Sequence, residues 1–479
     1  MATRSQGAGP MVVRGTVTPS RASRFFLPRV QEAPHTPETP ALSISFSTPY
    51  MPTPSTPSEP DSLRVRVVDS DSDADVPLSP CLGRKRRKMV QEPRIPFALQ
   101  GQSRGPRWAQ RTYTQEKRST HAFFSRMATR TEHPYYVEST VPHAMASPLC
   151  ATYMHAARDV DDPLPCLAVG DDEGRIHLLD TQTPSDSLEK SFVKHTTQPL
   201  VHGSVFAAEW RSDDHVLAIG GSDYSVSAWD VQHELCVAHY DAHNGSARAL
   251  AWDPDDRRLL ASGARDGAIY LWDLRQSAAA VHIHKAHGMP RTRRGTRVAG
   301  VTSLAYVNGQ LASSCSENGV VKMWDLRSAQ APRMTSSDLS VGRAGNTRPH
   351  GVSSLAYAPT RRRLYAACTD GCVYVLDPSL EADALPPYEP RSLYHAVQRR
   401  NTLYARAALY DERYLALGCN TGDIVVWDTD AAHAAVLPRA HEENAEVNAV
   451  SWMHGPRGPT LASASDDQTV RVWEPGHSV

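Results

Sequence analysis

The stretch LLASGARDGAIYLWDLR at residues 259–275 predicts the fold of most of the chain. Two short runs of strand-forming residues flank an Asp-Gly pair, which is typical of a β-hairpin turn, and the second run ends in Trp-Asp. A similar stretch, TLASASDDQTVRVWEPG, occupies residues 460–476. Recurrence of one hairpin unit indicates a repeat protein.

The strand-ending motif or a relic of it occurs seven times, 43 to 52 residues apart. This spacing is slightly above the ~40–45 residues of a WD repeat, and loops accommodate the excess. One four-stranded blade cannot bury both of its faces, whereas seven blades around an axis can. The sequence therefore predicts an all-β, seven-bladed WD-repeat β-propeller over residues 131–479. The seven endings are HLLD (177–180), SAWD (227–230), IYLWD (269–273), VKMWD (321–325), VYVLD (373–377), IVVWD (424–428) and VRVWE (470–474).

We expect the last repeat to lack a fourth strand of its own, since only six residues follow Trp473 in the sequence. A segment from before the first repeat has to supply it, because an open sheet edge invites unwanted pairing. We predict that this segment lies within 131–147, around HPYYVEST at 133–140.

Residues 1–130 have a different composition. Fifteen of the 36 prolines lie in the first 100 residues, which predicts a long disordered N-terminal tail. Residues 1–130 carry 20 Lys/Arg against 10 Asp/Glu, whereas residues 131–479 have a net charge of −11. Such a basic tail either favours anionic partners, such as nucleic acid or an acidic protein face, or serves only to solvate the chain.

Motifs that carry chemistry are absent from the sequence. HExxH, GxSxG and the phosphate-binding GxxxxGK[ST] do not occur. Cys368 and Cys372 flank one turn but lack the two further ligands that zinc needs. No apolar run approaches the ~18 residues of a membrane span, and the N-terminus lacks a secretory signal. We expect a soluble, intracellular, non-catalytic protein with no metal, cofactor, membrane partner or small-molecule substrate.

A recurring set of polar and aromatic residues suggests either catalysis or structure. His243, Asp266 and Trp272 recur at similar spacing as His441, Asp467 and Trp473. The sequence favours the structural interpretation, in which buried hydrogen bonds join the strands of one blade.

Two WDLR motifs, at residues 272–275 and 324–327, suggest an interaction surface. In each, an arginine follows the strand-ending Trp-Asp at a blade rim, and arginine is favoured at interface hot spots. The alternative is that each arginine only pairs with acids of its own blade. The candidate partner-binding residues are Trp272, Asp273, Arg275, Trp324, Asp325 and Arg327.

Residues 148–476 resemble the denticleless family of WD-repeat proteins, which are substrate receptors of a cullin-four RING ubiquitin ligase. Two WDLR repeats separated by a basic insertion support this resemblance. The stretches that carry it are CLAVGDDEGRIHLLDTQT (166–183), LASGARDGAIYLWDLR (260–275), VTSLAYVNGQLASSCSENGVVKMWDLR (301–327), LYAACTDGCVYVLD (364–377) and LASASDDQTVRVW (461–473).

The resemblance implies that Arg275 and Arg327, oriented by Asp273 and Asp325, face the damaged-DNA-binding adaptor protein of the ligase. The second box departs from the usual Asp-Gly turn, with Glu-Asn-Gly at 317–319. The family's clients are replication and cell-cycle proteins that are degraded while bound to the sliding clamp on DNA. The alternative function is a chromatin or nucleic-acid scaffold without ligase attachment.

The basic insertion GMPRTRRGTR at 288–297 joins two blades, on the propeller face opposite the WDLR motifs. Its arginines suit an acidic clamp surface or a phosphate, or else form a solvated loop. They are Arg291, Arg293, Arg294 and Arg297.

The tail carries three further candidates. The basic run Arg84, Lys85, Arg86, Arg87 and Lys88 reads as a nuclear import signal and predicts a nuclear protein. Phe25 and Phe26 are a candidate clamp-binding peptide, although the usual Gln and aliphatic positions hold Pro19 and Ala22. Proline-directed phosphorylation would erode the tail's basic charge. Its candidate sites are Thr18, Thr36, Thr39, Thr48, Thr53, Thr56 and Ser79.

The segment 114–130 suggests a short helix with a weak apolar stripe of Ala122, Phe123 and Met127. It would pack on the adaptor or on the propeller. An enzyme, the third functional class, would instead require a polar central channel with perturbed titratable groups.

Overall fold

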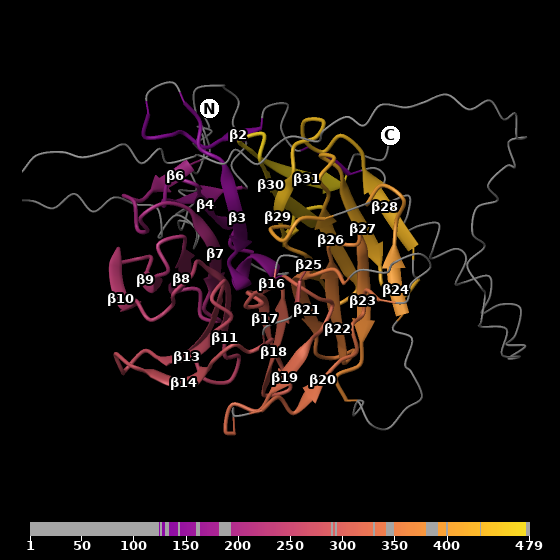
Figure 1. The fold of residues 1–479 in the computed structure, drawn as a ribbon. Coiled ribbons are helices and arrows are strands. Elements are labelled where there is room, and N and C mark those ends of the chain that lie inside the picture. Colours follow the sequence, from indigo (N-terminus) through magenta and orange to yellow (C-terminus); the bar gives the residue numbers. More distant parts are fainter. Residues whose placement is uncertain are drawn as a thin grey trace, which may run out of the picture. The chain divides into compact units, whose positions relative to one another are not determined.

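Six antiparallel four-stranded sheets and one five-stranded sheet form the blades in the computed structural model, which confirms the predicted seven-bladed propeller. Figure 1 shows them following one another around a common centre. The structure describes residues 124, 127–129, 134–141, 144–159, 163–181, 193–288, 291–292, 295–328, 331–341, 349–379, 391–398, 401–431 and 433–475. No helix among these residues is long and apolar enough to cross a membrane.

Several candidates lie outside the described residues. They are Arg293 and Arg294 of the basic insertion, the basic run 84–88, Phe25 and Phe26, and the candidate phosphorylation sites Thr18, Thr36, Thr39, Thr48, Thr53, Thr56 and Ser79.

Blades 1 to 3 each follow a simple meander, with the first strand of each blade lining the centre. Blade 1 comprises β3 (Pro148–Tyr153), β4 (Cys166–Asp171), β5 (Ile176–Asp180) and β6 (Val193–Thr196). Blade 2 comprises β7 (Val205–Trp210), β8 (Val216–Gly221), β9 (Val226–Asp230) and β10 (Leu235–Tyr240). Blade 3 comprises β11 (Ala247–Trp252), β12 (Leu259–Ala264), β13 (Ile269–Asp273) and β14 (Ala279–Ile283).

Blades 4 to 6 repeat this order after the small hairpin of β15 (Arg291–Thr292) and β16 (Gly295–Thr296). Blade 4 comprises β17 (Val301–Val307), β18 (Gln310–Cys315), β19 (Lys322–Trp324) and β20 (Met334–Thr335). Blade 5 comprises β21 (Val352–Ala358), β22 (Arg363–Cys368), β23 (Cys372–Leu376) and β24 (Arg391–Tyr394). Blade 6 comprises β25 (Ala408–Tyr410), β26 (Tyr414–Gly418), β27 (Ile424–Asp428) and β28 (His433–Leu437).

The second strand of each blade is a run of small and apolar residues because both of its faces are covered by neighbouring blades. Every residue of β4 and β8 is buried, as is all of β12 except its first residue. The core clusters accordingly lie between blades. One of them joins Ile269 and Leu271 of blade 3 to Leu304, Leu311 and Trp324 of blade 4.

Blade 7 is completed by the N-terminal side of the chain. Its own strands are β29 (Val447–Gly455), β30 (Gly458–Ser465) and β31 (Thr469–Pro475). Both β1 (Met127–Thr129) and β2 (Tyr135–Tyr136) pair antiparallel with β31. The pairing of β2 confirms that the segment around 133–140 closes the ring. The predicted domain boundary at residue 131 is wrong for this blade, since β1 lies before it.

The segment 114–130 contributes to the propeller core through a residue outside the predicted stripe. Phe124 is buried and lies edge-on to Tyr414 and Trp452, with ring centroids 4.8 and 6.1 Å apart. Met127 is buried in the same cluster. Ala122 and Phe123 lie outside the described residues. At Phe124 and Met127, therefore, the segment packs against the propeller.

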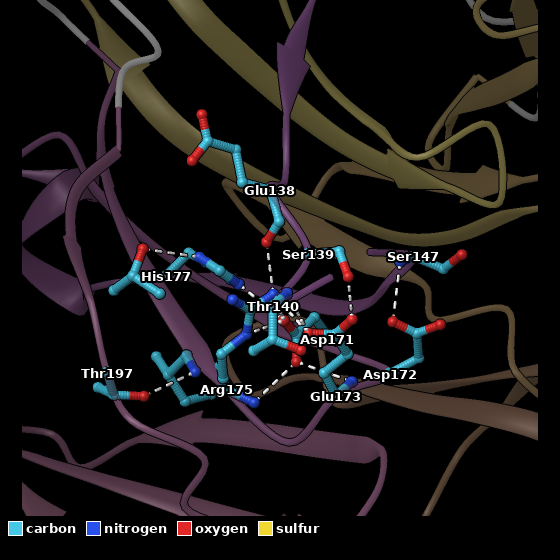
Figure 2. Close-up of polar contacts among 12 residues, drawn as sticks. Glu138, Ser139, Thr140, Ser147, Asp171, Asp172, Glu173, Arg175, His177 and Thr197 are labelled. Atoms are coloured by element: carbon cyan, nitrogen blue, oxygen red, sulfur yellow. Dashed lines mark hydrogen bonds and ion pairs between the residues drawn. The ribbon is translucent and has the colours of Figure 1, made fainter. Parts of the chain in front are cut away.

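After β2 the chain crosses from blade 7 to blade 1 and is held there by polar contacts (Figure 2). Arg175 in the β4–β5 turn donates a hydrogen bond to the carbonyl oxygen of Glu138. Glu173 accepts hydrogen bonds from the hydroxyl of Ser139 and, at 2.7 Å, from the backbone N–H of Thr140. The same segment thus contacts both the first and the last blade.

Candidate functional site

The meander of each blade assigns its turns to two opposite faces. On one face the β11–β12 and β13–β14 turns of blade 3 meet, since the N–H of Leu274 donates to the carbonyl of Arg258 at 3.0 Å. We call this the WDLR face. On the other, the β12–β13 turn meets the connection to blade 4, since the N–H of Ala286 donates to Gly267 at 2.8 Å. We call this the connection face.

The arginine of the first WDLR motif is exposed and already paired. Arg275 donates from Nε to Asp273 at 2.9 and 3.2 Å and from Nη2 at 2.5 Å. These hydrogen bonds hold the pKa of Asp273 at about 2. The Arg275 side chain is nevertheless 60% exposed, whereas that of Asp273 is 6% exposed. Pairing within the blade therefore orients this guanidinium toward solvent without hiding it.

The second WDLR motif has the same backbone turn, but the side chain of its arginine is not paired with the aspartate of the motif. The N–H of Arg327 donates to Asp325 at 3.0 Å, as the N–H of Arg275 does to Asp273. The side chain of Arg327 is exposed and, unlike Arg275 with Asp273, makes no ion pair within the described part of the chain. The two motifs therefore present arginines on one face of consecutive blades.

The tryptophans of the two motifs do not reach the surface. Trp272 and Trp324 are buried, and each indole N–H donates at 2.8 Å to a serine of the neighbouring strand, Ser262 and Ser313 respectively. Their assignment as partner-contacting residues is therefore wrong on steric grounds. They support the motifs from inside the blades.

The recurring His-Asp-Trp set is structural in blade 7. Trp473 donates to Ser463 at 2.9 Å, and Ser463 lies 2.7 Å from Nε2 of His441. Nδ1 of His441 lies 2.9 Å from Asp467. Blade 3 repeats the pattern with His243, Ser262, Trp272 and Asp266, the last at 3.4 Å from His243. These chains of hydrogen bonds satisfy groups buried between strands.

The corresponding set in blade 4 is incomplete. Nε2 of His287 lies 2.9 Å from Ser313, but its Nδ1 is buried and has no hydrogen-bond partner among the residues that the structure describes. Asn318 occupies the place of the aspartate, six residues before the tryptophan. Burial and the nearby charge of Lys322 lower the pKa of His287 to about 3. The departure from Asp-Gly in the second WDLR repeat thus removes a buried charge partner.

The basic insertion lies on the connection face, as the sequence predicts. Arg291 belongs to β15, which pairs with β16, and Arg297 is exposed just after this hairpin. The N–H of Ala299 donates to Gly288 at 3.2 Å, so the base of the insertion is closed.

The central channel holds a cavity of about 750 Å³ lined by the first strands of the blades. Burial raises the pKa of Glu209, and a hydrogen bond to Asp214 raises the pKa of His155. Asp214 also accepts the backbone N–H groups of His155 and Ala156, at 2.8 and 2.7 Å. These hydrogen bonds to Asp214 fix the β3–β4 connection against blade 2. His155 and Asp214 therefore have a structural role.

One guanidinium crosses the channel. Arg406 donates to the carbonyl oxygens of Thr302 and Ser353 at 2.6 and 2.9 Å, and to that of Arg248 at 2.5 Å. Burial lowers the pKa of Arg406 to about 10. A residue between blades 5 and 6 thus links the innermost strands of blades 3, 4 and 5. No cluster of three metal-ligating side chains occurs in the described ranges.

Comparison with known proteins agrees with this architecture. The family model described as WD domain, G-beta repeat matches residues 234–273, 291–325, 344–377 and 435–474. A denticleless protein homolog of Danio rerio is 26% identical over 339 residues, covering 64% of this chain and 49% of the relative. Cell division cycle protein cdt2 of Schizosaccharomyces pombe is 27% identical over 337 residues, covering 64% and 66%.

Denticleless protein homolog A of Xenopus laevis is 29% identical over 348 residues, which is 66% of this chain and 46% of the relative. The matched part of the chain spans about half to two thirds of the length of these curated relatives. The repeat matches and the seven-bladed ring show that the chain is a WD-repeat β-propeller, and its sequence is similar to proteins of the denticleless type.

Proposed function

We propose that the chain is the substrate-recognition subunit of a nuclear cullin-four RING ubiquitin ligase. In this role it binds the ligase's adaptor protein and presents replication and cell-cycle proteins for ubiquitination, while other subunits transfer ubiquitin. The similarity to denticleless proteins and cdt2 supports this role.

One observation carries the proposal. Arg275 and Arg327 follow equivalent strands of consecutive blades, start from the same backbone turn and are both exposed on the WDLR face. A planar guanidinium makes directional, bidentate contacts, and arginine is over-represented among residues that dominate binding energy. A pair of them on adjacent blades suits one protein partner that spans both blades.

The clients would occupy the opposite face. The basic insertion lies on the connection face, so a client bound there leaves the WDLR face free for the adaptor. We propose that these clients are replication-linked proteins, bound to the sliding clamp on DNA, and that Arg291, Arg293, Arg294 and Arg297 contact an acidic or phosphate-bearing surface of that assembly. The basic run 84–88 would direct the chain to the nucleus.

The test is capture of the adaptor from nuclear extract by the full chain and by its Arg275→Ala/Arg327→Ala variant. We expect at least a tenfold loss of captured adaptor in the variant, since hot-spot arginines each contribute about 2 kcal/mol or more.

The matched control is Arg257→Ala/Arg258→Ala, which removes two exposed arginines from the same face of blade 3. This control should capture as much adaptor as the parent. Equal capture by the WDLR variant would refute the role of the two motifs. Absence of capture by the parent would favour the alternative, a chromatin-associated scaffold without ligase attachment.

A further inference from the structure

A second hollow opens on the connection face, between blades 2 and 3. This pocket has a volume of about 460 Å³. Its wall combines aromatic rings with arginines, and its lining includes Phe206, Tyr224, Asn244, Arg248, Arg265 and Asp266.

Arg248 is held rigidly at this pocket by aromatic rings. Its guanidinium carbon lies 4.8 Å from the ring centroid of Phe206 and 4.9 Å from that of Tyr404. Nη2 donates to the hydroxyl of Tyr404 and Nε to that of Ser246, both at 3.3 Å. Cation–π contacts and two hydrogen bonds therefore fix the guanidinium before any ligand binds.

The two arginines of the pocket have no acidic partner among the described residues. Arg248 uses two of its N–H groups on neutral hydroxyls, and Arg265 is exposed in the β12–β13 turn. The one carboxylate of the lining, Asp266, already accepts hydrogen bonds from the backbone N–H groups of Asn244 and Ala268 and contacts His243. A half-buried cation without a counter-charge favours an anionic ligand.

Backbone packing keeps the floor of the pocket in place. Gly245 approaches the β12–β13 turn so closely that a Cβ there would lie 2.8 Å from the backbone nitrogen of Asp266. The same turn contacts the segment that follows the basic insertion, because a Cβ on Gly267 would lie 2.8 Å from the carbonyl oxygen of Ala299. Arg297, two residues before Ala299, is exposed.

We propose that this pocket binds an anionic side chain of a peptide segment from a partner protein, with Arg248 and Arg265 as the hydrogen-bond donors. The side chain of Tyr224 would pack against the peptide residues next to the anionic one. The anion is a carboxylate or a phosphate, since both match the planar fork of a guanidinium. The bounded pocket between two blades suits a short peptide better than an extended nucleic-acid backbone. Under the proposed ligase function this peptide belongs to the client, but the binding step itself requires no ligase subunit.

The test measures fluorescence anisotropy of labelled peptides with the full chain. Three peptides share one sequence that contains a phenylalanine and carry glutamate, phosphoserine or glutamine at the same positions. We expect saturable binding of the glutamate or phosphoserine peptide and none of the glutamine peptide. Whichever anionic peptide binds with the higher affinity shows whether the ligand is a carboxylate or a phosphate.

Arg248→Gln and Arg265→Gln should each weaken this binding by about tenfold, since each removes charge-assisted hydrogen bonds to the anion. Arg439→Gln is the matched control, because Arg439 is exposed on the same face in the connection between blades 6 and 7. Arg265 lies in an exposed turn, where its replacement should leave the fold intact. Arg265→Gln therefore tests anionic-peptide binding even if Arg248→Gln disturbs folding.

Unchanged affinity in Arg265→Gln, or equal binding of the glutamine peptide, would overturn the proposal. Tighter binding of a single-stranded oligodeoxynucleotide than of either anionic peptide would overturn it in favour of a nucleic-acid surface. Adaptor capture is measured separately, so failure of the peptide site and failure of the ligase role give different results.

Discussion

The polar residues inside the blades form directional chains rather than isolated pairs. In blade 7 the indole N–H of Trp473 occupies one lone pair of the Ser463 oxygen, which leaves the serine hydroxyl to donate to Nε2 of His441. Nδ1–H of His441 then donates to Asp467. This order requires a neutral imidazole and an ionised carboxylate. Burial lowers the pKa of His441, which agrees with the neutral form.

These groups predict a loss of stability in acid. Burial opposes ionisation of Asp467, but hydrogen bonds from His441 and Thr469 outweigh it and hold its pKa at about 2. In the unfolded chain the same carboxyl titrates near ~4, and a histidine near ~6.5. At a pH between a group's pKa in the unfolded state and its lower pKa in the folded state, the unfolded state binds more protons. The free energy of unfolding therefore falls as pH decreases through this range.

We therefore expect urea midpoints to fall below about pH 6.5 as His441 becomes protonated on unfolding, and to fall again between about pH 4 and 2 through Asp467. Asp467→Asn should lower the free energy of unfolding at pH 7 by about 2 kcal/mol and flatten the second step. A parent and variant with parallel pH profiles below pH 4 would contradict this assignment.

Blade 4 offers the reverse experiment. Within the described part of the chain, Nδ1 of His287 is buried and has no hydrogen-bond partner, and Asn318 stands at the position of the missing aspartate. An unsatisfied buried polar atom costs about 1–3 kcal/mol. Asn318→Asp should therefore raise the free energy of unfolding by about 1 kcal/mol at pH 7, measured by urea titration, and raise the pKa of His287 in NMR titration. A destabilised variant would show that the carboxylate cannot reach the imidazole.

At the level of elements, closure of the ring depends on a segment with little sequence signal of its own. Met127 pairs with Pro475 and Tyr135 with Val470, so β1 and β2 lie along different halves of β31. Phe124 adds a buried aromatic side chain just before β1. The last blade is thus completed both by backbone pairing and by side-chain packing.

Phe124→Ala should destabilise the propeller by about 3–5 kcal/mol, because it leaves a cavity between Tyr414 and Trp452. Thermal unfolding of the full chain measures the effect. Tyr136→Ala is the matched control, since Tyr136 is 42% exposed and its loss should cost less than about 1 kcal/mol. Equal melting temperatures for the two variants would argue against a role of Phe124 in closure.

The sequence was sufficient to predict the structural elements that repeat along the chain. It was insufficient to predict those that occur once. The Trp-Asp endings predicted the blades because each copy supports the others, and the missing fourth strand predicted closure near Tyr135. Phe124 was missed because it lies in a basic segment with a weak apolar stripe. The cluster of Phe206, Arg248 and Tyr404 had no local signal, because its members come from three separate parts of the ring.

For the described propeller as a whole, the blades are joined at the centre as well as at the seam. Arg406 donates to carbonyl groups of three blades, and the segment after β2 joins blades 7 and 1. Strands of five or six residues separate the two faces in blades 2 and 3, which corresponds to roughly 17–20 Å. Charges that far apart are screened at physiological salt, where the Debye length is about 8 Å.

This separation predicts that the two proposed surfaces act independently. Arg275→Ala/Arg327→Ala should lose the adaptor and keep anionic-peptide affinity within a factor of about two, since distant sites are additive within ~0.5 kcal/mol. Arg265→Gln should show the converse. The two measurements, made on the parent, on each variant and on the combination of both, form a double-mutant cycle. Peptide binding that weakens severalfold with the WDLR variant would show instead that the ring couples its faces, and the rigid contacts of Arg406 would then be the first place to look for the coupling.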